Sequence, residues 1–236
     1  MLEIINAPGF SVAVLQIVLI DIVLSGDNAV VIALACRNLP PAQRRLGILW
    51  GVAGAVGLRI LLTFFAVGLL SFPWLKLCGG VLLLWIGIQL LIPEDEGGPD
   101  IQSADHLLGA IRTIIVADFV MSLDNVIGVA AAAKGNVYLL GFGLVVSIPL
   151  IVWSSQLILK LMERYPVVVI CGAGLLGWVA GEMMISDPAL GGWVALQWPS
   201  AHYLAPALGA LLVVVTGKWI ERRHAARRDL TIISRD

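Results

Sequence analysis

Long apolar stretches separated by short polar breaks dominate the sequence. They predict helices near 10–35, 46–70, 73–92, 109–133, 137–159, 166–186 and 203–220. Most of these stretches reach the roughly 20 residues that an α-helix needs to cross a bilayer. The pattern therefore predicts an all-α, polytopic transmembrane bundle with about seven spans.

Composition agrees with this expectation. Hydrophobic residues make up 59% of the chain and charged residues 13%, and the mean hydropathy is +0.96. Soluble domains carry about a quarter charged residues. We therefore expect a single membrane domain over 1–236, with the lipid bilayer as its main partner. The net charge of -1 gives no reason to expect nucleic acid as a partner.

The sequence contains an internal repeat. The segment DIVLSGDN at 21–28 aligns without a gap with DFVMSLDN at 118–125, and a second match aligns Gln89 with Glu182. The predicted parts are repeat one at 10–92, an acidic loop at 93–108, repeat two at 109–186, an additional helix at 203–220 and a basic tail at 221–236. Since each repeat has three helices, the two copies must cross the membrane in opposite directions. This 3+3 inverted repeat places a site near the midplane in many secondary transporters.

Four carboxylates of the two motifs fall inside predicted spans, and Glu182 is a fifth. Each of the four costs about 2.5 to 3.5 kcal/mol at a helix centre, so together they cost on the order of 10 kcal/mol. Arg59 is the one Lys or Arg away from the ends of the predicted spans, so ion pairing cannot neutralise all of them. Protonation, water or a bound cation must stabilise the rest. The four residues are Asp21, Asp27, Asp118 and Asp124.

The motifs offer almost only hard oxygen ligands. On a continuous helix Asp21, Ser25 and Asn28 share one face, while Asp27 points about 120° away. Gly26 would let the helix unwind and expose carbonyl ligands. Oxygen ligands suit Mg²⁺, Ca²⁺ and Mn²⁺. The predicted metal ligands are Asp21, Asp27, Asn28, Asp118, Asp124 and Asn125, with Ser25, Ser122, Met121 and Glu182 as additional candidates.

Three of the singled-out residues have a second interpretation. Met121 would add a soft contact that favours Mn²⁺ over Ca²⁺, but its expected role is packing. Glu182 either lines the transport path or lies near the membrane face. Arg59 either falls onto an Asp between turnovers or snorkels to the interface, and we expect snorkelling. The histidines His106, His202 and His224 are expected in loops or the tail.

Lys and Arg predict the orientation. They gather in the tail and in alternate loops, so the positive-inside rule puts the C-terminus in the cytoplasm and the N-terminus outside. The first apolar run has no Lys or Arg before it and contains Asp21 and Asp27. We therefore expect no cleaved signal peptide.

The sequence resembles the TerC family of integral membrane proteins, and within it the short YjbE-type branch. The residues that carry the resemblance are Asp21, Gly26-Asp27-Asn28, Asp118 and 122–125, and the similarity runs from about Phe10 to Trp219. The family is associated with manganese efflux and tellurite resistance and is grouped with the LysE superfamily. The resemblance implies a prokaryotic plasma (inner) membrane location.

We expect a secondary transporter that exports a divalent cation, Mn²⁺ first, coupled to protons and without a prosthetic group. No GxxxxGK[ST] loop is present for ATP hydrolysis. Export of another hard cation such as Ca²⁺, or a non-transporting scaffold in metal stress, stays open. An intramembrane aspartyl protease is disfavoured, because Leu24 and Ile20 stand where Gly and Tyr are required. We therefore do not expect an enzyme.

Overall fold

The computed structural model describes residues 26–70, 72–92, 101–132, 137–198 and 200–233, and every regular element in these residues is a helix. An all-α fold was predicted, and this prediction is confirmed. The helices are α3 (Gly26–Cys36), α4 (Pro41–Leu70), α5 (Leu75–Leu91), α6 (Ile101–Ala132), α7 (Val137–Arg164), α8 (Pro166–Ile185), α9 (Gly191–Gln197) and α10 (Ala201–Ile233).

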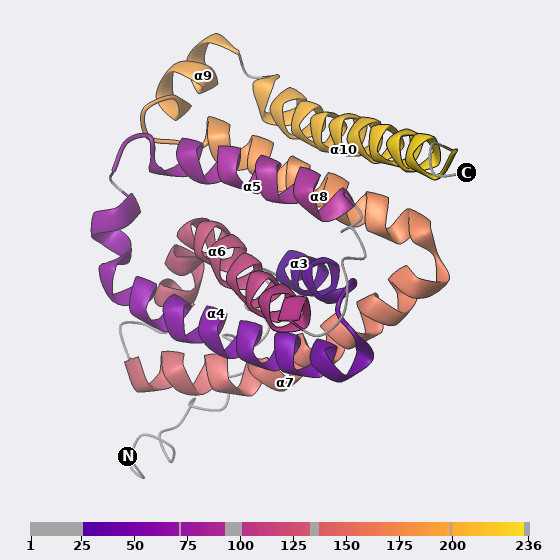
Figure 1. Ribbon diagram of the computed structural model, residues 1–236. Helices are drawn as coiled ribbons and strands as arrows, with labels where there is room; N and C mark the ends of the chain where they lie inside the picture. Colours follow the sequence, from indigo (N-terminus) through magenta and orange to yellow (C-terminus); the bar gives the residue numbers. More distant parts are fainter. Residues whose placement is uncertain (1–25, 71, 93–100, 133–136, 199, 234–236) are drawn as a thin grey trace.

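The long helices form layers (Figure 1). Helix α10 packs outside α5 and α8, which pack against each other. Helices α3 and α6 lie in the middle, and α4 and α7 cover their other side. One apolar cluster, which includes Val31, Leu83 and Leu176, fills the space between the α5–α8 layer and the middle layer. A second cluster, which includes Ile48 and Ile114, lies between the middle layer and α4 and α7.

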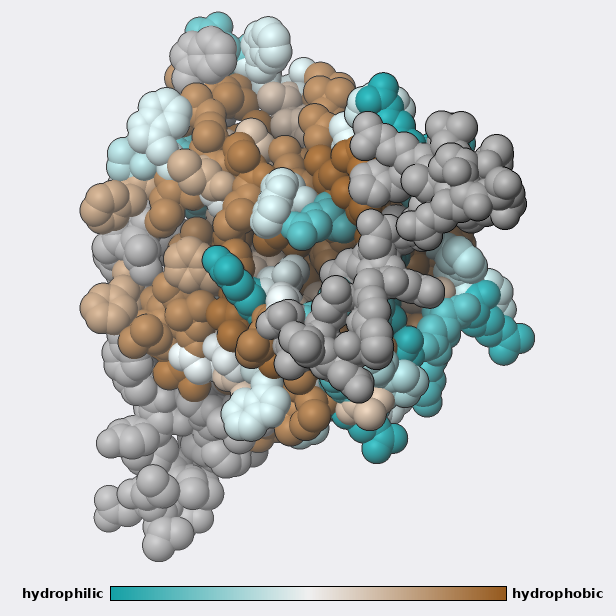
Figure 2. All heavy atoms as spheres, viewed as in Figure 1, coloured by the Kyte–Doolittle hydropathy of each residue, from teal (hydrophilic) through white to brown (hydrophobic). Residues whose placement is uncertain are grey.

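The surface is that of a membrane protein. Four described helical segments are long and apolar enough to cross a bilayer: Pro41–Thr63, His106–Leu123, Pro166–Ile185 and Ala201–Arg223. Large hydrophobic side chains are exposed along these helices and on α7, among them Trp50, Trp153 and Leu208. Figure 2 shows apolar residues over much of one face and hydrophilic residues gathered toward one edge. Exposed apolar area of this extent needs lipid as its solvent.

The helix contacts follow the predicted repeat. Helix α3 packs against α7 and α8, and α6, its counterpart in the second copy, packs against α4 and α5, which are the counterparts of α7 and α8. The pairs α3–α6, α4–α7 and α5–α8 also contact each other. This is the pattern that a pseudo-twofold axis between two copies of three helices produces.

Glycines allow α10 to approach α8 closely. A Cβ atom on Gly177 would collide with the backbone of Gly209, and one on Gly181 would collide with the backbone of Ala205. Small residues at such positions are typical of packed transmembrane helices, because they increase van der Waals contact between backbones. Helix α10, which corresponds to the predicted additional helix, therefore packs closely against α8.

The helices differ from the prediction most at the start of α6, at the end of α10 and in the presence of α9. Helix α6 begins at Ile101, inside the predicted loop at 93–108, and α10 continues to Ile233, through most of the predicted tail. The short helix α9 was not predicted. Hydropathy identifies the apolar part of a helix, whereas the polar turns of α6 and α10 continue the same hydrogen-bonded helix outside that part.

Asp187 connects the end of α8 to the start of α5. Its Oδ1 accepts from the backbone N–H of Trp74 at 2.9 Å and of Ala189 at 2.8 Å, and its Oδ2 accepts from the N–H of Leu77 at 3.1 Å. Trp74 adopts a left-handed conformation with φ 71° at this point. From the turn that follows α8, the carboxylate therefore caps the N-terminus of α5, where free N–H groups and the helix dipole favour a negative charge.

Candidate functional site

A charged cluster lies buried between α4 and α6. Arg59 Nη2 lies 2.5 Å from Asp118 Oδ1, and Arg59 Nε donates to Ser122 Oγ at 3.0 Å. Ser122 Oγ in turn donates to Asp118 Oδ2 at 3.1 Å. Exposed fractions are 2% for Arg59, 6% for Asp118 and 0% for Ser122. Asp118 and Ser122 are one helical turn apart, so they face Arg59 together, and both carboxylate oxygens are occupied.

The expectation that Arg59 snorkels to the interface was wrong. Its side chain is buried and pairs with Asp118 across two helices. Arg59 lies about 27 Å along α4 from Pro41 at 1.5 Å per residue. The carboxylate on α6 compensates the charge in place, and the Ser122 hydroxyl accepts a second hydrogen bond from the guanidinium.

The first copy of the motif contributes Asp27 and Asn28 in the first turn of α3. Asp27 Oδ1 accepts from the backbone N–H of Asn28 at 2.8 Å. Asn28 is 4% exposed, and neither its Nδ2 nor its Oδ1 has a hydrogen-bond partner among the described residues. A buried amide left in this state costs about 1 to 3 kcal/mol. Asn28 therefore holds a buried amide that the described residues do not satisfy.

The two copies of the motif lie on neighbouring helices. Helix α3, which carries Asp27 and Asn28, is in direct contact with α6, which carries Asp118 and Ser122. Asp118 is buried and Asp27 is half-buried.

Four predicted ligands are not placed. Asp21 and Ser25 lie outside the described residues, and Asp124 and Asn125 belong to α6 but their side chains are outside the description. Within the described part of the chain, no group of three or more His, Cys, Asp or Glu forms a metal cage. The complete cation site therefore stays a prediction.

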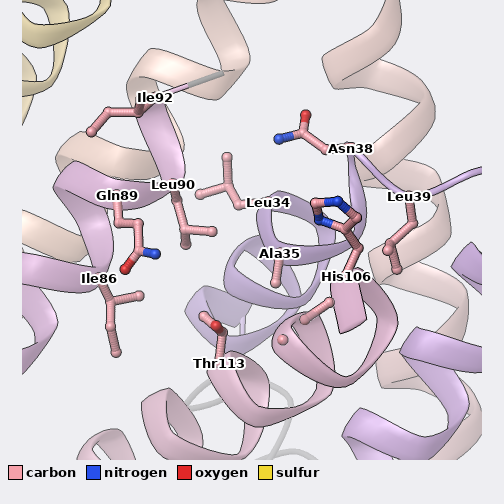
Figure 3. Close-up of a pocket in the computed structure, with 12 residues that line it drawn as sticks. Leu34, Ala35, Asn38, Leu39, Ile86, Gln89, Leu90, Ile92, His106 and Thr113 are labelled. Carbon is pink, nitrogen blue, oxygen red and sulfur yellow. The ribbon is translucent and has the colours of Figure 1, made fainter. Parts of the chain in front are cut away.

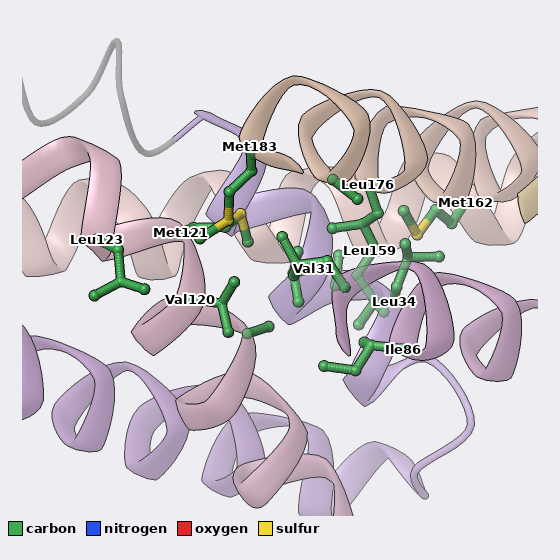
Figure 4. Packing of buried hydrophobic residues seen from close by; sticks show 14 residues of the cluster. Val31, Leu34, Ile86, Val120, Met121, Leu123, Leu159, Met162, Leu176 and Met183 are labelled. Carbon is green, nitrogen blue, oxygen red and sulfur yellow. The ribbon is translucent and has the colours of Figure 1, made fainter. Parts of the chain in front are cut away.

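Two additional candidates lie apart from this charged cluster. Met121 is buried in the apolar cluster shown in Figure 4, together with Val120 and Met183, which agrees with a packing role. Glu182 is exposed on α8, so the described structure gives it no place in the interior. Its role in transport stays a prediction.

A cavity of about 100 Å³ opens where α3 and α5 end and α6 begins. Its polar residues are Asn38, Gln89, His106 and Thr113 (Figure 3). His106 was expected in a loop, but it lies in α6. Leu34 and Ile86 line the cavity and also belong to the apolar cluster of Figure 4. That cluster therefore lies between the cavity and the centre of the bundle.

No sequence signal indicated that Asp187 caps α5, because an Asp after a span has many uses. Arg59 is the one cation away from the ends of the predicted spans, and this position was the signal that it needed a buried partner.

Sequence comparisons agree with this architecture. Residues 6–225 match the family described as Integral membrane protein TerC family. The chain is 44% identical over 213 residues to the Uncharacterized membrane protein YjbE of Bacillus subtilis, covering 90% of this chain and 97% of that protein. It is 26% identical over 179 residues to the UPF0053 inner membrane protein YgdQ of Escherichia coli K12, covering 69% and 75%. No solved structure matches. The polytopic helical bundle, the duplicated acidic motif and the match over nearly the whole length together establish that this chain belongs to the TerC family of integral membrane proteins.

Proposed function

We propose that this chain exports a divalent hard cation, Mn²⁺ in the first place, from the cytoplasm in exchange for protons. The observation that supports the proposal is the contact between α3, which carries Asp27 and the buried, unpartnered Asn28, and α6, which carries Asp118. These groups supply carboxylate and amide oxygens inside an apolar bundle. Such groups are expensive in a membrane unless they bind something, and hard divalent cations are the ligands that suit them.

Charge at one end of the bundle supports the orientation. Arg44 donates to the backbone carbonyl of Leu39 at 2.8 Å and pairs with Glu163, joining the start of α4 to the end of α7. Arg45, Lys160 and Arg164 are exposed at the same end. By the positive-inside rule this end faces the cytoplasm. Leu39 also lines the cavity of Figure 3, so the cavity opens toward the cytoplasm and serves as the entry for the cation.

Export requires an energy source. Moving two positive charges out against an inside-negative potential costs about 4.6 kcal/mol per 100 mV. Protons moving inward supply this energy, because the carboxylates that bind the cation also bind protons. Release of protons frees the site for the cation, and release of the cation outside frees it for protons.

The proposal is tested in bacteria that lack their own Mn²⁺ exporters. Cells that express the wild-type chain are expected to tolerate added Mn²⁺ and to contain less of it. Asp27→Asn and Asp124→Asn are expected to abolish both effects while inserting into the membrane at wild-type levels, because each removes one ligand charge. Glu163→Gln, at the exposed edge, is the matched control. Full tolerance in both aspartate variants would contradict the proposal.

A further inference from the structure

Arg59 occupies the carboxylate that the proposed cation needs. Its Nη2 lies 2.5 Å from Asp118 Oδ1, and through Ser122 it also reaches Oδ2 by a chain of 3.0 and 3.1 Å contacts. A guanidinium this close to Asp118 repels a divalent cation at the same oxygens, and the repulsion is strong in a buried site. Arg59 and the cation therefore exclude each other at Asp118.

We propose that Arg59 is a tethered competitor of the transported cation: it holds Asp118 in the empty carrier, gives way when the cation binds, and displaces the cation by returning to Asp118. The inference rests on the proposed function and adds to it the step that releases the cation. Arg59 is a positioning residue, because it acts through Asp118 and does not touch the cation.

The position of Arg59 supports this role. It belongs to α4, whereas Asp27, Asn28 and Asp118 belong to α3 and α6. Its guanidinium compensates the Asp118 carboxylate when no metal is bound. The empty carrier can then change its conformation without burying uncompensated negative charge.

A competitor and a purely structural ion pair predict opposite effects on binding. Removing a competitor makes the cation bind more tightly and leave more slowly, so that binding improves while transport declines. Removing a structural pair lowers stability and weakens binding or leaves it unchanged. Affinity and turnover measured on the same variant therefore separate the two roles.

The experiment measures Mn²⁺ binding by calorimetry and Mn²⁺ efflux from proteoliposomes, both with the full chain. Arg59→Gln is expected to bind Mn²⁺ on the order of tenfold more tightly, because a charge-assisted hydrogen bond no longer competes, and to turn over more slowly. Arg59→Lys keeps a charge but loses the planar fork, and a smaller gain in affinity is expected. Lys218→Gln, in the middle of α10 and outside the charged cluster, is the matched control and should change neither quantity.

If Arg59→Gln does not fold, Arg59→Lys decides alone: equal or weaker Mn²⁺ binding would overturn the inference. In an Asp118→Asn background, Arg59→Gln is expected to change affinity little, because the contested carboxylate is gone. Wild-type binding and efflux with no gain in affinity in either Arg59 variant would refute the competitor role and leave the proposed function standing. Absence of divalent cation binding in wild type and both variants would refute the two together.

Discussion

At the scale of single residues, the interior of this membrane protein holds two polar groups in opposite states. Asp118 has its charge compensated by Arg59 and both oxygens occupied. Asn28 is buried with both polar atoms of its amide unpartnered among the described residues. The Arg59–Asp118 pair stabilises the fold without a bound ion. The buried Asn28 amide lowers stability unless a ligand satisfies it. This difference leads to two predictions about stability.

Asp118→Asn should lower stability strongly, because it leaves the Arg59 charge buried without its partner. Breaking one partner of a buried pair costs about 3 to 5 kcal/mol, whereas replacing both by apolar residues of similar volume is often neutral. The double variant Arg59→Met with Asp118→Leu should therefore recover most of the loss. Thermal unfolding in detergent measures the stability of the single and the double variant against wild type. Equal stability of the single and double variants would show that the pair is not the cause.

Asn28→Leu should leave stability unchanged or raise it by about 1 to 3 kcal/mol, since it removes a buried amide whose hydrogen bonds are not made. The same change should abolish Mn²⁺ export, because it removes an oxygen ligand. Gln43→Leu, near the start of α4, is the control, because it removes another buried oxygen without a partner among the described residues, away from the motifs. A clear loss of stability in Asn28→Leu would mean that the amide has a structural partner.

At the scale of elements, the start of α5 depends on a residue from another helix end. Burial of Asp187 raises its pKa, but the backbone N–H groups of Ala189, Trp74, Leu77 and Lys76 together lower it more, so the pKa lies below its usual value. A lowered pKa means that the ionised group stabilises the fold above the unfolded value of about 3.9, and that this contribution is lost as pH falls through the lower folded value.

Asp187→Asn should therefore lower stability by about 1 kcal/mol near neutral pH, as the loss of a charged N-cap does. The gap between wild type and variant should begin to close as the pH drops below about 4, where the unfolded chain binds the proton, and should vanish only below the lowered pKa of the folded carboxyl. Unfolding temperatures across this pH range test it, with Glu182→Gln, an exposed carboxylate of α8, as control. A gap that persists at the lowest pH would assign the effect to geometry alone.

The helices and their duplication could be predicted from the sequence, and the partners of particular side chains could not. Apolar length gives the spans, and the paired motifs give the repeat, because polar matches do not recur by composition. The contact between Arg59 and Asp118 depends on how α4 is rotated about its axis relative to α6. The cap at Asp187 depends on where α8 ends relative to α5. Both are properties of packing, which periodicity does not encode.

At the scale of the whole molecule, the layers give the site its setting. Helices α3 and α6 carry the motifs in the middle of the bundle, and the neighbouring layers keep them away from lipid. Leu34 and Ile86 line the cavity of Figure 3 and belong to the apolar cluster that also includes residues of α6. In the proposed alternating-access carrier, this cluster has to open before a cation can pass from the cavity to the motifs.

The most direct test of the account is cation flux through the purified protein in proteoliposomes, with Mn²⁺, Ca²⁺, Mg²⁺ and Zn²⁺ compared in the presence and absence of a proton gradient. We expect saturable flux that favours Mn²⁺, rises when protons flow in the opposite direction and is lost in Asp27→Asn. If folded protein in tightly sealed liposomes transported none of the four cations, this result would contradict the proposed export function and would favour a scaffold role.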